Sequence, residues 1–172
     1  RFKIHSAAKS MHHSYMGGLL EHSLSICEIC DFLSKHYSNV NRDILIASAL
    51  LHDVGKMFEL SPFPDNDYTD DGQLLGHIII GTELVTKEAN KIENFPHQLK
   101  SLLKHSIISH HGEYEFGSPK RPKTIEAFIL HCADELDAKV KMYEDAILAD
   151  NTNGNWVGYH KMLARNIRKT TF

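Results

Sequence analysis

The chain has 172 residues, 42% hydrophobic and 24% charged, which is typical of one globular domain with a buried core. A formal net charge of -3 excludes a generally basic nucleic-acid binder but leaves room for a local basic edge. No apolar run approaches the roughly 20 residues of a membrane-spanning helix, and the start lacks the apolar core of a signal peptide. Because the chain begins with Arg1 and not with Met, we expect it to be a fragment.

Helical periodicity dominates the sequence, and no convincing alternating strand pattern appears in it. In chain order, the expected elements are a mildly helical opening to about Met16, helices over about 19–37, 41–53, 73–92, 96–110 and 124–150, loops over 60–72 and 111–123, and a short basic closing helix. Asn39 or Asn41 should cap the second helix and Thr124 the last long one, while Pro96 suits a first helical turn. These elements predict an all-α, compact array of about six to seven helices in a single domain, 1–172.

The three cysteines indicate a reducing compartment. Cys27 and Cys30 form a C-x-x-C pair, but it lies within a helical pattern and has no second pair, which favours buried thiols over zinc or redox chemistry. The compositional anomaly is the 13 histidines, which indicate metal or proton-transfer chemistry.

The most informative stretch is an apolar helical run that ends in His52 and Asp53, followed by Gly55 and Lys56. We expect Gly55 to be a helix C-cap at positive φ, so that the His-Asp pair lies on the last turn and faces a cleft. Further metal-ligand candidates come from other helices: His22, His77, His110, His111 and Asp134. Helices that converge on one cleft can supply four to seven nitrogen and oxygen ligands to metal.

The order His, His-Asp, His, His-His, Asp resembles the HD superfamily of metal-dependent phosphohydrolases, and more closely the YhaM-type 3′–5′ exoribonucleases. The matching blocks are HHSYMGGLLEHSL (12–24), ALLHDVGK (49–56), YTDDGQLLGHIIIG (68–81), SHHGEYEFGSPKRPKT (109–124) and LHCADELDAKV (130–140). The resemblance implies an HD-domain helical array and a bacterial, cytoplasmic enzyme. YhaM-type enzymes also carry an N-terminal OB-type nucleic-acid-binding domain, for which these 172 residues leave no room.

The resemblance also implies two divalent metal ions. The ligands of the first would be His22, His52, Asp53 and Asp134, and those of the second His77 and His110, with His111 a further candidate. Asp53 would bridge the two, because a carboxylate can bind two cations whereas an imidazole nitrogen binds one. The nitrogen-rich ligand set suits Mn, Fe, Zn or Ni better than Mg, and the resemblance makes Mn the first choice, with Fe, Zn, Ni and Mg as alternatives.

Several side chains near these ligands have open roles. We expect His110 and His111 to point different ways from one helix end, with His110 the ligand and His111 a contact to the substrate or to one of the ligands. Asp137 lies on the helix face of Asp134 and could orient a ligand or a water, and so could His131, although a packed core histidine is an equal alternative. His105 is expected to be structural.

The metal ions would activate a water, and the resulting hydroxide would attack a phosphodiester in line. Two residues join Asp53 as catalytic candidates: Lys56 could reach a phosphoryl oxygen, or be a surface lysine at a helix end, and His13 could contact the scissile phosphate. Substrate-binding candidates lie on the loop after the His-His pair, where cations could grip phosphates and an aromatic ring could stack on a base: Lys120, Arg121, Lys123 and Tyr114.

The predicted substrate is single-stranded RNA, trimmed from its 3′ end to nucleoside 5′-monophosphates, with single-stranded DNA or nucleotides as alternatives and no membrane partner. Two other functions stay open: an HD phosphohydrolase of mononucleotides or cyclic dinucleotides, and a catalytically silent HD module that senses nucleotides. An oligomer is compatible with the sequence.

Overall fold

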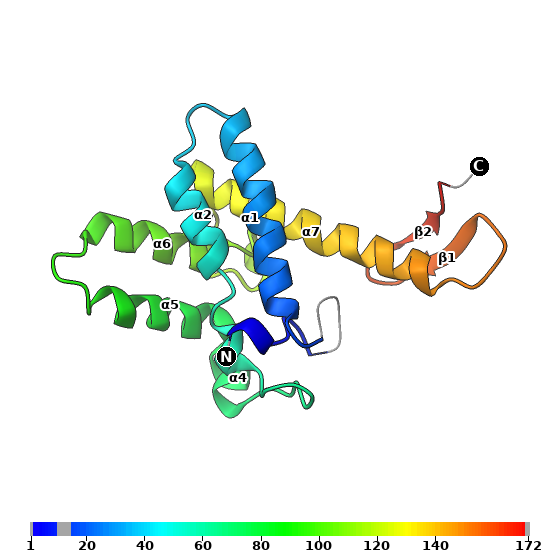
Figure 1. Ribbon diagram of the computed structural model, residues 1–172, viewed down its shortest axis with the longest axis horizontal. Helices are drawn as coiled ribbons and strands as arrows, with labels where there is room; N and C mark the ends of the chain where they lie inside the picture. Colours follow the sequence, from blue (N-terminus) through cyan, green and yellow to red (C-terminus); the bar gives the residue numbers. More distant parts are fainter. Residues whose placement is uncertain (1, 10–14, 171–172) are drawn as a thin grey trace.

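A computed structural model describes residues 2–9 and 15–170 and is mostly helical, as predicted (Figure 1). The five longer helices are α1 (Gly18–His36), α2 (Arg42–Leu51), α5 (Gly76–Ala89), α6 (His97–Ser109) and α7 (Ile125–Ala149). The shorter elements are α3 (Lys56–Glu59), α4 (Asp70–Leu74), two 3-10 turns (Phe2–Ile4 and Tyr114–Phe116) and a hairpin of β1 (Trp156–His160) and β2 (Arg165–Arg168).

Helix α2 lies at the centre of the array, between the pair α1 and α7 and the pair α5 and α6 (Figure 1). One hydrophobic core joins it to α1 and α7, with Ile26, Leu45 and Leu130 fully buried. A second core, around Val85 and Ile107, lies between α2, α5 and α6. Each fully buried leucine or isoleucine contributes roughly 1.5–3 kcal/mol of transfer free energy. The C-terminal end of α2 is therefore held between two packed layers.

The predicted caps of two helices are confirmed. The side chain of Asn41 accepts a hydrogen bond from the amide of Ile44 at 3.2 Å, and Thr124 accepts one from the amide of Ala127 at 3.1 Å. Each cap satisfies an amide that has no partner within its helix. Pro96 occupies the position just before α6 and not its first turn.

The single helix predicted over 73–92 is wrong, because the chain breaks at Gly76. Thr69 caps the short α4, which ends at Leu74, and Gly76 then takes φ 73°, a left-handed conformation that glycine adopts at little cost. Helix α5 starts from this point in a new direction. The break places His77 in the first turn of α5, beside Glu59.

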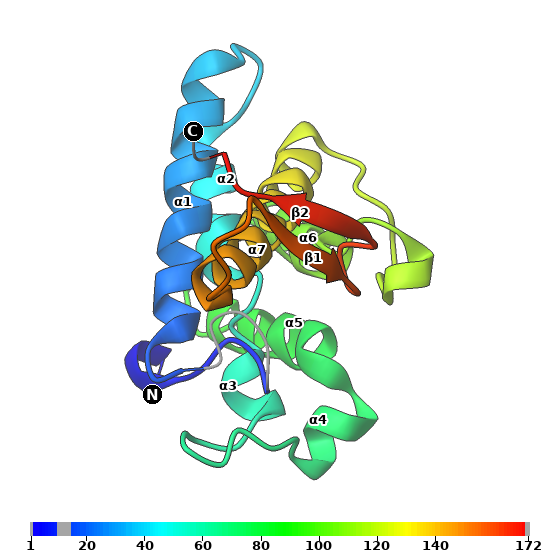
Figure 2. The same cartoon turned by 90° about the vertical axis from the view of Figure 1, so that its right-hand side faces the viewer.

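The predicted closing helix is also wrong, since the chain ends in the antiparallel hairpin of β1 and β2. The hairpin returns along α7, which extends beyond the helical core (Figures 1 and 2). Leu163 in its turn and Ile167 on β2 are buried, which explains why this short pair of strands is stable beside the helix.

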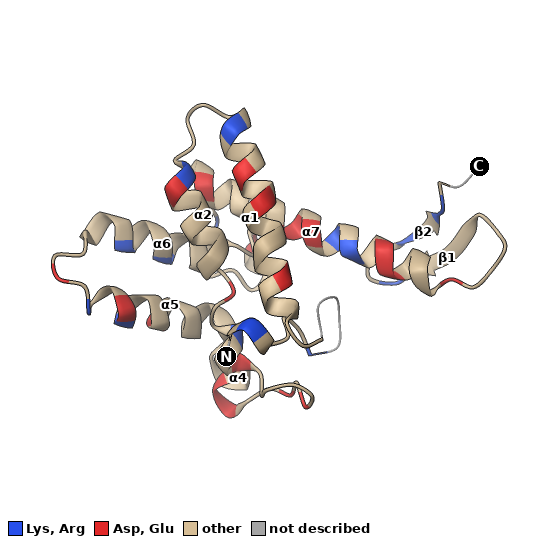
Figure 3. Cartoon of the chain, in the orientation of Figure 1, with Lys and Arg blue, Asp and Glu red and all other residues tan. Residues whose placement is uncertain are grey.

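Among the described residues, no helix is long and apolar enough to cross a lipid bilayer. Acidic side chains are spread over α1, α2, α4 and α7, whereas the hairpin carries only basic ones (Figure 3).

Candidate metal centre

Five imidazoles and two carboxylates, drawn from five separate segments, meet at the C-terminal end of α2. They are His22 on α1, His52 and Asp53 just after α2, His77 on α5, His110 and His111 just after α6, and Asp134 on α7. They include two groups in which the ligand atoms lie within 4.8 Å of one another, one of His22, His52 and Asp53 and one of His77, His110 and His111. The metal-ligand candidates of the sequence thus converge in space.

In all five rings, Nδ1 is within hydrogen-bonding distance of an oxygen. His52 donates to the carbonyl of Ala49 at 2.8 Å, His110 to that of Ile107 at 2.7 Å, and His111 to that of Phe116 at 2.9 Å. The corresponding acceptors are Asp137 for His22 and Glu59 for His77, both at 3.0 Å. Because these oxygens accept a proton held on Nδ1, they set the tautomer in which Nε2 is the metal-binding nitrogen.

Asp53 lies between the two groups. Its Oδ2 is 3.4 Å from His52 Nε2 and 3.5 Å from His22 Nε2, and its Oδ1 is 3.5 Å from His77 Nε2 and 3.7 Å from His110 Nε2. Burial raises the pKa of Asp53, but the charge of Lys56 and the contacts with His52 outweigh this effect and hold it well below its usual value. The buried carboxylate is therefore ionised, and each of its oxygens faces one group.

His22 is surrounded by carboxylates on α7. Its Nε2 lies 3.1 Å from Asp134 Oδ1, and its Nδ1 contacts Asp137, which also accepts a hydrogen bond from Ser25. Burial lowers the pKa of His22, but the hydrogen bonds to the two carboxylates and the charge of Asp53 prevail and raise it to about 9. Nε2 therefore faces enough negative charge to hold a cationic partner.

The expectation that His110 and His111 point different ways is wrong. Both contribute an atom to the group around His77, and their ring centroids are 4.4 Å apart. Burial lowers the pKa of both residues, which keeps the rings neutral at pH 7 and suited to metal binding. His131 donates from Nδ1 to the carbonyl of His110 at 2.8 Å and so fixes this end of α6.

The role predicted for Gly55 is also wrong, because its φ is -63° and not positive. A Cβ atom at this position would lie 2.0 Å from the carbonyl oxygen of His77 and 2.7 Å from the amide of Gly81. Glycine is needed here because the turn after Asp53 packs directly on the backbone of α5. This contact brings the two groups of ligands together.

A metal ion fits this arrangement. Asp53 Oδ1 and His77 Nε2 are buried and have no hydrogen-bond partner among the described residues, although burial of such atoms normally costs about 1–3 kcal/mol each. They lie 3.5 Å apart, and both belong to residue types that bind first-row transition metals. A cation would satisfy both atoms.

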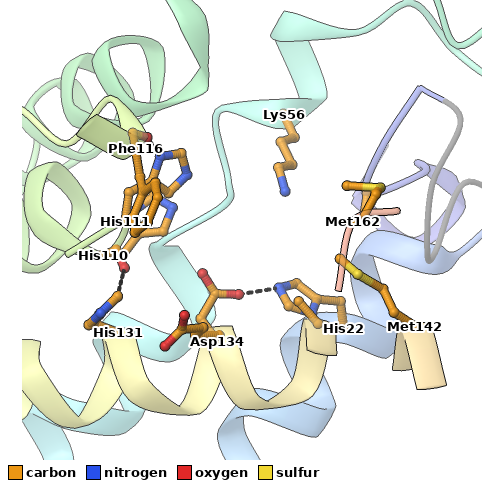
Figure 4. Close-up of a pocket in the computed structure, with 12 residues that line it drawn as sticks. His22, Lys56, His110, His111, Phe116, His131, Asp134, Met142 and Met162 are labelled. Carbon is orange, nitrogen blue, oxygen red and sulfur yellow. Dashed lines mark hydrogen bonds and ion pairs between the residues drawn. The ribbon is translucent and has the colours of Figure 1, made fainter. Parts of the chain in front are cut away.

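The ligands open onto a cleft of about 520 Å³ (Figure 4). Lys56 extends its amine into the cleft, and Phe116, Met142 and Met162 contribute apolar side chains. Lys56 Nζ is 2.7 Å from Asp53 Oδ2, and although burial lowers its pKa, the charge of Asp53 outweighs this effect and raises it. The amine is therefore charged at the floor of the cleft.

The loop after the His-His pair, predicted to bind substrate, lies beside the ligands, but none of its four candidates lines the cleft. Tyr114, Lys120, Arg121 and Lys123 are exposed, and Arg121 pairs with Glu113 at 2.6 Å and covers the ring of Tyr114. His105, expected to be structural, accepts a hydrogen bond from the amide of Lys123 at 2.8 Å. His13 lies outside the described residues. The sequence reasoning missed Glu59, Met142 and Met162, which no motif marks.

The chain matches the model of the HD domain family over residues 19–139 and belongs to that family. It is an HD-domain phosphohydrolase, as the resemblance implied, and it is related to YhaM exoribonucleases. It is 41% identical over 147 residues to a 3′-5′ exoribonuclease YhaM from Geobacillus sp. (strain WCH70), a match that covers 86% of this chain and 45% of that protein. The chain thus spans less than half of the relative's length. No solved structure matches it.

Proposed function

We propose that this chain is the catalytic domain of a metal-dependent 3′–5′ exoribonuclease that trims single-stranded RNA to nucleoside 5′-monophosphates. The observation that carries the proposal is the position of Asp53, whose two oxygens face two separate groups of histidines. A carboxylate with one oxygen toward each group could be shared by the two cations of a two-metal phosphodiester hydrolysis. The similarity to the Geobacillus 3′-5′ exoribonuclease YhaM supports RNA as the substrate.

In this proposal the centre would hold two divalent cations. The first would be held by His22, His52, Asp53 and Asp134, and the second by His77, His110 and His111, with Asp53 shared between them. The mixed nitrogen and oxygen ligands suit Mn, Fe, Zn or Ni better than Mg, and the resemblance to the HD family makes Mn the first choice among them. When bound, the cations supply a hydroxide at neutral pH and neutralise the charge that develops on the phosphoryl oxygens.

The protein groups around the ligands would bind and orient the substrate. Lys56, whose amine is charged and points into the cleft, is placed to contact a phosphoryl oxygen of the RNA. We assign a second phosphate contact to His13 and backbone contacts to the exposed cations of the substrate loop, Lys120, Arg121 and Lys123. Tyr114 would stack on a base once Arg121 moves from its ring.

The test is hydrolysis by protein that has been freed of metal with a chelator and reloaded with Mn. A 5′-labelled single-stranded RNA should give a ladder that shortens one nucleotide at a time, and a 3′-labelled copy should release labelled nucleoside 5′-monophosphate at once. Free mononucleotides and cyclic dinucleotides serve as competing substrates. Rapid hydrolysis of these nucleotides, with the RNA left intact, would contradict the proposal and favour the nucleotide hydrolase.

A further inference from the structure

The hairpin presents two aromatic side chains on one exposed face. Trp156 and Tyr159 are three residues apart, and in a regular strand they would face opposite sides. A bulge between Trp156 and Gly158, where Gly158 has φ 106°, shifts the register by one residue. Tyr159 pairs with Asn166 and Trp156 with Arg168, both neighbours of the buried Ile167 and so on the face opposite to it.

The exposed fractions of these side chains agree with this register. Trp156 is 59% exposed and Tyr159 is 64% exposed, whereas Ile167 on the opposite face is 1% exposed. The bulge therefore gathers two large rings and a guanidinium on the outer face of a two-stranded sheet. We call this face, formed by Trp156, Tyr159, Asn166 and Arg168, the hairpin platform.

The charged side chains of the hairpin itself are all basic. Residues 151–172 contain four of the 19 lysines and arginines and none of the 22 acidic residues, in a chain whose net charge is negative. Lys169 pairs with Asp150 at 2.5 Å and fastens β2 to the end of α7. Within the described residues, Lys161, Arg165 and Arg168 form no ion pair with a carboxylate. Their charge is available to an anionic partner (Figure 3).

The hairpin also reaches the metal-ligand cleft. Met162, in the turn between the strands, lines the same cleft as His22 and Asp134 (Figure 4). Lys161 is its neighbour in sequence and is exposed. Four residue steps at about 3.3 Å each separate the two ends of β1, so the platform extends roughly 13 Å away from the turn. A chain bound along β1 would end at the cleft.

We propose that the hairpin platform binds the part of a single-stranded RNA that lies upstream of its reacting 3′ end. Bases stack on Trp156 and Tyr159, Arg168 and Lys161 bind backbone phosphates, and the strand passes Met162 into the cleft. Proteins that bind single-stranded nucleic acids without sequence preference use surfaces on which aromatic rings lie among cations. This inference rests on the proposed function and names the element that positions its substrate.

A first test uses the fact that Trp156 is the only tryptophan of the chain. Its fluorescence therefore reports on the platform alone, and it can be followed in metal-free protein, where no hydrolysis occurs. A single-stranded RNA 12-mer should quench the emission and saturate, whereas inorganic polyphosphate, which has charge but no bases, should leave the quantum yield nearly unchanged. Equal effects of both polyanions, or no effect of the RNA, would overturn the proposal.

A second test compares Trp156→Ala and Tyr159→Ala with Phe32→Ala as a matched control. Phe32 is 69% exposed and lies on α1, remote from the hairpin (Figure 1). By fluorescence anisotropy of labelled RNA, each platform variant should raise the Kd roughly five- to tenfold, the effect of one lost base stack, and the control should not. In hydrolysis, KM for a 12-mer should rise with kcat nearly unchanged, and KM for a dinucleotide should stay the same.

The outcomes separate this inference from the proposed function. If the reloaded protein degrades RNA while Trp156→Ala changes neither Kd nor KM, the hairpin platform is wrong and the exoribonuclease stands. If the protein hydrolyses only nucleotides yet the RNA still quenches Trp156, the exoribonuclease is wrong and the platform stands. A platform variant that changes the sedimentation coefficient without changing RNA affinity would show an interface between copies and overturn the inference.

Discussion

At the residue scale, the centre depends on a single carboxylate that serves both groups of histidines. Replacing Asp53 with Asn keeps the shape of the side chain but removes the charge from both groups. We expect Asp53→Asn to reduce Mn-dependent hydrolysis to background. The variant should keep its helical circular dichroism, because the two hydrophobic cores do not include this residue. Its thermal midpoint should fall by roughly 6–20 °C, since the loss of a buried partner for Lys56 costs about 3–5 kcal/mol.

The matched control for this variant is Asp43→Asn, in the first turn of α2, where the side chain is exposed. The control should keep full activity. Hydrolysis by Asp53→Asn at a rate close to that of the control would show that the carboxylate is not a shared ligand.

Asp137 is expected to act through His22 and not on the substrate. Its carboxylate accepts from Nδ1 of His22 and from the hydroxyl of Ser25, which fixes the ring. Loss of such a partner typically lowers metal affinity by about 10- to 100-fold. We expect Asp137→Asn to weaken Mn binding in this range by titration calorimetry and to recover activity at high Mn concentration. Asp145→Asn, on the same helix, is the control, and equal affinities of the two variants would contradict the role.

The ligand candidates could be chosen from the sequence because a His-Asp pair at a helix end is unusual and because the order of the other candidates resembles the HD superfamily, and the structure brings all seven together. The hydrogen-bond partners of these ligands could not be predicted from the sequence. Glu59, which contacts both the ring and the amide of His77, is 18 residues away from it and follows no motif. Its position depends on the packing of α3 against α5, which the local pattern does not encode.

At the scale of elements, the turn after α2 requires close contact with α5. Because a Cβ on Gly55 would lie 2.0 Å from the carbonyl of His77, one backbone must move in Gly55→Ala. We expect the free energy of unfolding to fall by about 1–3 kcal/mol, as for other overpacked sites, and Mn affinity to fall with it. Urea denaturation and titration calorimetry measure the two effects.

Gly154→Ala is the matched control for this variant, since the nearest atom to its added Cβ would be 3.9 Å away. The control should unfold at the same urea concentration as the unmodified protein. If Gly55→Ala is as stable as the control and binds Mn equally well, the contact between the turn and α5 does not position the ligands.

Elements with local signals were predictable, and those set by tertiary contacts were not. The long α7 follows from its apolar spacing and the Thr124 cap. The hairpin could not be predicted, because the bulge between Trp156 and Gly158 disrupts the alternation of β1 and because polar and basic residues flank Ile167 on β2. Its stability comes from side chains buried beside α7, a contact that periodicity does not reveal.

At the scale of the whole molecule, the ligand set joins segments from α1 to α7. His22 and Asp134, which are 3.1 Å apart, come from opposite ends of the family match, and the ligands from α5 and α6 are held by the second hydrophobic core. A cation bound by all of them favours the folded state, because the unfolded chain does not present these atoms together. Metal binding should therefore stabilise the entire array of helices.

The stabilisation can be estimated from mass action. At a free Mn concentration of 100 times the Kd, one ion contributes about 2.7 kcal/mol. For a chain of this length each kcal/mol shifts the thermal midpoint by roughly 2–4 °C, so Mn should raise it by roughly 5–11 °C over the chelated protein. Differential scanning calorimetry of the metal-free and reloaded protein measures the shift, and Mg at equal concentration should give a smaller one.

The variants make this measurement specific to the centre. In Asp53→Asn the shift should be mostly lost, whereas Asp43→Asn, which removes an exposed carboxylate, should keep it. A full shift in both would place the stabilising ion elsewhere on the surface. If Mn does not shift the thermal midpoint of the unmodified protein and the activity still depends on Mn, the ligand segments do not close around the ion as a unit. The convergence of α1, α5, α6 and α7 on the end of α2 would then not be the basis of the activity.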